Sequence, residues 1–82
     1  MLVTLENVEV LEISTRDYEG KTYRNLIVYE YGQRFPSVRV LRLFPDRVDV
    51  AEKLVGKRCS LTANLFAQKG KDLQLTFQGV AA

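Results

Sequence analysis

Basic and aromatic side chains lie close together in the middle of the chain, and their types and spacing point to binding chemistry. Three short stretches carry the pattern: Arg16-Asp17-Tyr18, Lys21-Thr22-Tyr23-Arg24 and Arg34-Phe35. A basic side chain attracts a phosphate and an aromatic ring stacks on any base, which is the combination that holds single-stranded nucleic acid. Basic residues taken singly also keep small domains soluble, so the aromatic neighbours are what favour a ligand.

Tyrosines extend the pattern along one predicted strand. Tyr23, Tyr29 and Tyr31 share one parity, whereas Leu26 and Val28 share the other, so the two faces of this strand differ in kind. The tyrosine face predicts a stacking surface. The competing interpretation is packing in a core or an interface, with each hydroxyl bonded to a partner.

Two further aromatic residues are candidates for contacts. Phe35 lies in a predicted loop, where an exposed aromatic ring indicates either a dimer contact or a ligand contact. Phe66 occupies a polar position in an alternating strand and is followed by the basic hairpin turn Gln68-Lys69-Gly70-Lys71.

Residues that support catalysis are scarce. The sequence has no histidine, no tryptophan and one cysteine, Cys59. A Ser-His-Asp or Cys-His relay therefore lacks its base, a zinc site lacks ligands, and an internal disulfide lacks a second thiol. We expect a non-enzymatic protein with no cofactor, no metal and no small-molecule substrate, in which Cys59 is a buried small apolar residue.

Charge is distributed unevenly, although the net charge is only +2. Residues 1–15 carry −3, residues 16–42 carry +3, residues 43–56 carry −1 and residues 57–82 carry +3. A single cysteine suits a reducing compartment, and the acidic first fifteen residues do not resemble a signal peptide. No apolar run is long enough to span a membrane. A cytoplasmic location without membrane contact is expected.

The elements that position these residues are predicted to be mainly strands within one domain, residues 1–82. A strand over residues 3–14 changes the parity of its apolar residues twice, which predicts bulges or a bent strand that serves two sheet faces, and residues 15–20 predict a turn. Further strands are predicted over residues 21–31, 37–43, 58–67 and 73–78. In the last two strands the apolar parity, Cys59, Leu61, Ala63, Leu65 and Ala67 with Leu73, Leu75 and Phe77, is expected to face inward.

One helix is predicted over residues 45–55. Asp49 to Glu52 form a capping box, Gly56 ends the helix, and one side is apolar through Val50, Ala51, Leu54 and Val55. Five strands with a short helix between the third and the fourth predict a mainly β, OB-type barrel, whose second and third strands and loops bind oligonucleotides. The helix is expected to cover one end of this barrel. An SH3-like barrel fits the helix less well.

Three stretches resemble a known family, the helix-destabilising, single-stranded-DNA-binding proteins of filamentous bacteriophages. Gly20-Lys21-Thr22-Tyr23 resembles the family's Gly-Lys-Pro-Tyr turn, and Gly32-Gln33-Arg34-Phe35-Pro36 resembles its Gly-x-x-Tyr-Pro loop. Phe66 with the basic hairpin resembles the family's late hairpin, although Lys69 and Lys71 stand where the family has an aromatic residue.

This resemblance implies that Lys21 meets a phosphate, that Tyr23 stacks on a base, and that Phe35 belongs to a loop tied to dimer contacts. Either Tyr29 or Tyr31 would be the second stacking residue. We therefore expect a homodimer that coats and protects single-stranded DNA during phage DNA replication in the host cytoplasm, with RNA left open as a ligand. The expected nucleic-acid contacts are Arg16, Tyr18, Lys21, Tyr23, Arg24, Tyr29, Tyr31, Arg39, Phe66, Lys69 and Lys71.

A second hypothesis belongs to another class of protein. In it the chain is a small barrel that docks Tyr29, Tyr31 and Phe35 onto a partner in a replication or secretion complex. The basic residues would then only keep the domain soluble. Retention of an oligonucleotide distinguishes the two hypotheses.

Overall fold

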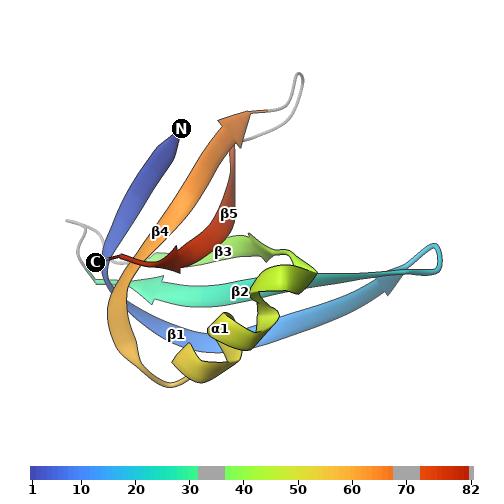
Figure 1. Ribbon diagram of the computed structural model, residues 1–82, viewed down its shortest axis with the longest axis horizontal. Helices are drawn as coiled ribbons and strands as arrows, with labels where there is room; N and C mark the ends of the chain where they lie inside the picture. The colour runs from blue at the N-terminus through green and yellow to red at the C-terminus, as the bar shows by residue number, and fades with distance from the viewer. Residues whose placement is uncertain (32–36, 68–72, 82) are drawn as a thin grey trace.

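The computed structural model describes residues 1–31, 37–67 and 73–81. These residues form five strands, one short 3-10 turn and one α-helix (Figure 1): β1 (Leu2–Tyr18), β2 (Lys21–Glu30), β3 (Ser37–Leu43), η1 (Pro45–Arg47), α1 (Val48–Leu54), β4 (Arg58–Ala67) and β5 (Leu73–Val80). The strands close a barrel in the order β1-β2-β3-β5-β4. Strands β3 and β5 pair in parallel, and the other neighbours are antiparallel. The predicted mainly β, OB-like barrel with one short helix between the third and fourth strands is confirmed.

Strand β1 is long, is bent at two irregularities and pairs with both β2 and β4. Its pairing with β4 shifts between Leu5 and Val8, where Asn7 has a φ of 53°, and its pairing with β2 shifts between Val10 and Glu12. These shifts confirm the bulges that the changes of parity predicted. They let one strand contribute buried side chains to both parts of the closed sheet.

The turn predicted over residues 15–20 is wrong in extent. Strand β1 continues to Tyr18, which pairs with Lys21, and only Glu19 and Gly20 turn the chain. Their φ angles of 50° and 75° are those of a two-residue turn whose twist matches the twist of the strands. The paired ends of β1 and β2 therefore extend beyond the rest of the barrel as a hairpin arm (Figure 1).

The core is built from the alternate residues of each strand. Val10, Leu26, Val28 and Leu41 are fully buried, together with Leu61, Ala63 and Phe77. The inward parity of β4 is confirmed at its centre, whereas Ala67 at its end is exposed. In β5 the prediction fails at Leu73, the first residue of the strand, which is 66% exposed, whereas Leu75 packs against the core.

Helix α1 contributes Ala51 to the core, and Val48 and Leu54 pack against it. The predicted capping box is wrong, because Pro45 starts a 3-10 turn and the helix then begins at Val48 without a side-chain cap. Two residues of the predicted apolar side are exposed, Val50 at 39% and Val55 at 42%. Gly56 ends the helix as predicted, with a φ of 83°.

Candidate nucleic-acid interface

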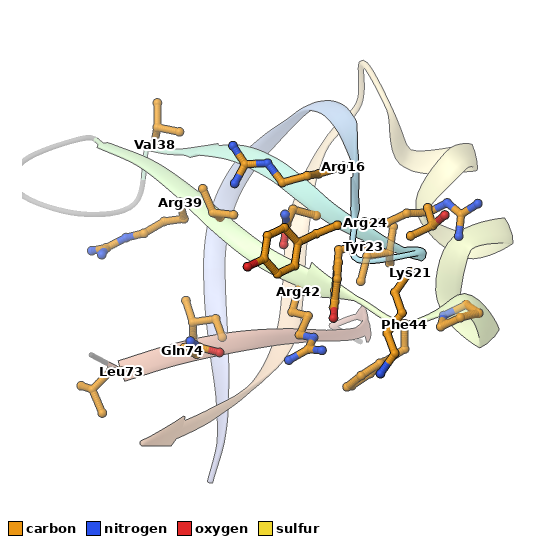
Figure 2. Close-up of a pocket in the computed structure, with 17 residues that line it drawn as sticks. Arg16, Lys21, Tyr23, Arg24, Val38, Arg39, Arg42, Phe44, Leu73 and Gln74 are labelled. Carbon is orange, nitrogen blue, oxygen red and sulfur yellow. The ribbon is translucent and has the colours of Figure 1, made fainter. Parts of the chain in front are cut away.

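A groove of about 1070 Å³ lies along the outer face of β2 and β3. The hairpin arm borders it on one side and the first residues of β5 border it on another. Six of the predicted contact residues line it: Arg16, Tyr18, Lys21, Tyr23, Arg24 and Arg39. Figure 2 shows their side chains gathered with others around this one surface.

The alternation of the strands explains which side chains face the groove. In β2, Leu26 and Val28 are buried, so Tyr23 and Asn25 point outward. In β3, Leu41 and Leu43 are buried, so the residues that alternate with them, Val38, Val40 and Arg42, take the outer face. The register pairs Asn25 with Arg42 across the two strands, which places Arg42 beside Tyr23 at the centre of the groove.

The groove is strongly cationic. Five basic residues line it: Arg16, Lys21, Arg24, Arg39 and Arg42. Among the described residues, no aspartate or glutamate lines it, although the whole chain carries ten acidic residues against twelve basic ones. An acid-free concave surface of this kind attracts an anion, because neighbouring positive charges reinforce one another's field.

One of these charges is already engaged. The Nε atom of Arg39 donates to Oε1 of Glu30 at 3.1 Å, and Glu30 is 1% exposed while the Arg39 side chain is 47% exposed. Glu30 is buried at the end of β2, between Val8 of β1 and Ser37 of β3. Arg39 therefore compensates a buried carboxylate from the edge of the groove, and its charge is less available to a ligand than that of Arg42.

Arg42 joins two aromatic rings. Its guanidinium carbon lies 5.9 Å from the ring centre of Tyr23 and 5.4 Å from that of Phe44. Both distances are within the range of cation–π attraction, which orders the three side chains relative to one another. Phe44 is 44% exposed, so its ring has a surface open to a ligand. The groove thus offers positive charge and aromatic surface side by side.

Tyr29 and Tyr31 lie outside the groove. The two rings are 4.7 Å apart at an angle of 55°, and the guanidinium of Arg58 lies 3.9 Å from the ring centre of Tyr31. The Tyr31 hydroxyl donates to Glu9 at 3.1 Å, and this bond to a carboxylate raises the pKa of Tyr31 above its ordinary value. Arg58 is held in turn by Asn7 at 2.8 Å.

This arrangement joins the end of β2 to the first bulge of β1 and the start of β4. Because Arg58 covers the ring of Tyr31 and Glu9 holds its hydroxyl, Tyr31 makes intramolecular contacts of the kind that the packing interpretation of the tyrosine face expected. Tyr29, half-buried, packs beside it. Of the three tyrosines on one parity, Tyr23 alone lines the groove.

The remaining predicted residues are Phe66, Phe35, Lys69 and Lys71, together with Cys59. Phe66 is half-buried on β4, opposite Gln74 of β5, and does not line the groove. Phe35, Lys69 and Lys71 lie outside the described residues. Cys59 is half-buried and not fully buried as expected, and its partial burial raises the pKa of its thiol.

Sequence reasoning missed several groove residues: Val38, Val40, Arg42, Phe44 and Leu73. The signal for Arg42 was present, because a basic residue between two leucines on an alternating strand must point outward. Phe44 follows the last residue of β3, and its direction depends on how the chain turns into η1. Leu73 was expected inside, and its place on the groove depends on where β5 leaves the core.

Comparisons with known proteins returned no matching family model, no similar curated protein and no similar solved structure. The residues of the groove are therefore the basis for proposing a function. Within residues 1–31, 37–67 and 73–81, the helical segments fall short of the length and hydrophobicity that a membrane span requires. No group of three or more potential metal ligands converges within that same part of the chain.

Proposed function

We propose that this protein is a non-enzymatic, single-stranded-DNA-binding protein that coats and protects its ligand with little sequence preference. The observation that carries the proposal is the groove that five basic residues line together with the rings of Tyr18, Tyr23 and Phe44, with no aspartate or glutamate among its described lining residues. Its place on the barrel adds support, because OB folds bind oligonucleotides with the face of the second and third strands.

Each part of the groove has a role in this proposal. Lys21 and Arg16 on the hairpin arm and Arg42 on β3 contact phosphates, while Tyr23 and Phe44 stack on bases. In a duplex the faces of the bases are already occupied by neighbouring base pairs, so stacking on a protein ring requires an unpaired strand, and the aromatic residues favour a single strand over a duplex. Since every base has an aromatic face, stacking is tolerant of sequence.

The biological setting and the oligomeric state extend the proposal. The resemblance of Gly20-Lys21-Thr22-Tyr23 to the phage turn supports a role in phage DNA replication. The same resemblance, with the limited core of an 82-residue domain, supports a homodimer. If Phe35 holds that dimer, Phe35→Ala shifts the sedimentation mass toward a monomer; an unchanged dimer removes this role from Phe35.

Fluorescence anisotropy with a labelled oligo-dT and a duplex of equal length tests the function. The single strand should bind more tightly, and log Kd should rise by roughly 0.7 per phosphate contact for each log unit of salt. Lys21→Ala with Tyr23→Ala should weaken binding by about fivefold to 150-fold or more, because stacking on one ring alone is worth about 1–3 kcal/mol and the phosphate contact of Lys21 is lost as well. An affinity independent of salt, or a preference for duplex, would refute the proposal.

Two control variants separate these effects from damage to the fold. Tyr23→Phe keeps the ring and removes the hydroxyl, so it should bind oligo-dT within about twofold of the unchanged protein. Lys53→Ala removes an exposed lysine of α1 that is not part of the groove, and it should leave the salt dependence unchanged. A loss in Lys53→Ala as large as in the double variant would mean that general charge, and not the groove, holds the DNA.

The alternative of a protein-docking barrel is less well supported. It relies on Tyr29, Tyr31 and Phe35 as a free aromatic surface, yet Tyr31 is engaged by Arg58 and Glu9. Under this alternative oligo-dT is not retained at all, so the same anisotropy measurement decides between the two functions.

A further inference from the structure

Exposed apolar side chains gather toward one end of the groove. Val38 and Leu73 lie toward this end, where Arg39 is also found with its charge paired to Glu30, and Lys21 and Phe44 lie toward the opposite end (Figure 2). The exposed apolar residues Val38, Val40 and Leu73 are here called the apolar end. Their exposed fractions are 55%, 55% and 66%.

The apolar end is not explained by packing within the barrel. Val38 and Val40 occupy successive outward positions of β3, where a solvated sheet face normally carries polar residues. Leu73 is the first residue of β5 and is also exposed. Single exposed apolar residues are common, but three that line the same groove indicate a surface that is covered when a ligand binds.

Arg42 gives the apolar end its relation to the ligand. It follows Val40 by two residues on the same face of β3, which is a separation of roughly 7 Å. A nucleotide whose phosphate meets Arg42 and whose neighbour stacks on Tyr23 can therefore place a base edge against Val40 and Val38. Aliphatic side chains cannot form hydrogen bonds with such an edge, so they discriminate only through apolar contact.

We propose that the apolar end contacts the 5-methyl group of thymine, which adds to the sequence-tolerant stacking a preference for thymine-containing single-stranded DNA over the corresponding RNA. This inference rests on the proposed function and names the ligand class of the same site. Thymine is the one common base whose edge presents a methyl group, and apolar side chains recognise it by contact. Uracil presents a hydrogen at that position, so it leaves Val38, Val40 and Leu73 less well covered.

Three oligonucleotides of equal length, oligo-dT, oligo-dU and oligo-rU, separate the methyl group from the sugar. Oligo-dT should bind about fourfold more tightly than oligo-dU for each methyl group that becomes buried, which is the effect of removing one such carbon from water. In Val38→Thr with Val40→Thr, this dT/dU ratio should fall toward one, while the affinity for oligo-dU changes by less than about twofold.

The variant is chosen so that it folds. Threonine keeps the branched shape of valine and suits a strand, and both positions are exposed. Val80→Thr is the matched control, because Val80 is a strand valine with 49% exposure that does not line the groove. The control should keep the dT/dU ratio of the unchanged protein.

Each remaining outcome has a separate meaning. Equal affinity for oligo-dT and oligo-dU overturns the inference and leaves the proposed function standing, even if both bind more tightly than oligo-rU. Failure to bind any of the three overturns the proposed function together with the inference. A double variant with an unchanged dT/dU ratio but a smaller sedimentation mass overturns the inference as well, and assigns the valines to a contact between two copies of the chain.

Discussion

Arg39 is expected to act mainly on the stability of the barrel, through its bond to Glu30. The Glu30 side chain is 1% exposed and accepts a 3.1 Å bond from Nε of Arg39. Replacing Arg39 by alanine removes this partner and leaves a carboxylate among the buried residues of β1, β2 and β3. A buried charge without a partner is strongly unfavourable, because the interior cannot replace the water that solvated it.

The structure bounds the size of the effect. Breaking a fully buried ion pair by removing one partner costs about 3–5 kcal/mol. Because the Arg39 side chain is 47% exposed, water reaches one side of the pair, and we expect a loss of about 2–3 kcal/mol. An 82-residue domain has a free energy of unfolding of roughly 4–12 kcal/mol. The loss should therefore lower Tm by roughly 8–24 °C.

Urea denaturation and thermal melting of Arg39→Ala measure this loss. Glu30→Met with Arg39→Met removes both charges and keeps apolar volume, so it should lie within about 1 kcal/mol of the unchanged protein. Binding of oligo-dT separates stability from function, because the salt dependence should be nearly unchanged when the charge of Arg39 is already compensated. A loss below about 0.5 kcal/mol in Arg39→Ala, or a double variant less stable than the single one, would refute the reasoning.

Three further predictions concern other parts of the molecule. Arg42→Ala should weaken oligo-dT binding about tenfold to a hundredfold in anisotropy and lower the slope of log Kd against log salt by about 0.7. Arg42→Lys keeps the charge and should restore this slope. An affinity of Arg42→Ala equal to that of the unchanged protein would contradict a phosphate contact by Arg42. The bond from Tyr31 to Glu9 raises the pKa of Tyr31, so its contribution to stability is fully present below a pH near 10.0 and is lost as the pH rises through the higher pKa of the folded state. Urea titrations at alkaline pH should show a shallower decline in Tyr31→Phe, and equal declines would argue against the bond. Gly20→Ala should lower the free energy of unfolding by about 1–2 kcal/mol, because the φ of Gly20 is 75°. Gly79→Ala, at an open position without a positive φ, should lower it by less than about 0.5 kcal/mol. Equal losses of stability in urea would exclude the turn as the cause.

The hairpin arm illustrates where local reasoning stops. The sequence pattern predicts both strands but gives the turn six residues, whereas Glu19 and Gly20 alone turn the chain. The residues before them, Arg16 to Tyr18, have no apolar alternation because neither face of the arm is buried by the barrel. Their strand conformation comes from pairing with Lys21 to Tyr23. This pairing cannot be predicted from the alternation within either segment alone.

The tyrosine face shows the same limit for the site. Tyr23, Tyr29 and Tyr31 share one parity, which places them on the same face of the strand predicted over residues 21–31 but gives no information about the neighbouring strands. Whether an outward side chain meets solvent or another side chain depends on its neighbours across the sheet. Arg58 reaches Tyr31 only because β4 pairs with β1 beside the bulge at Asn7. Arg42 reaches Tyr23 only through the register of β2 with β3.

The sequence by itself determined the order of the elements, the bulges of β1, the inward parity at the centre of β4 and the supply of basic and aromatic residues, because period-two alternation and turn residues act over short distances. Only the tertiary structure decided which of those residues share a groove. Closing the barrel places β3 between β2 and β5 and leaves Val38, Val40 and Leu73 exposed in the same groove as Arg42. The register of the strands and the positions at which they end determine which side chains line the groove. Both depend on contacts between residues far apart in the chain.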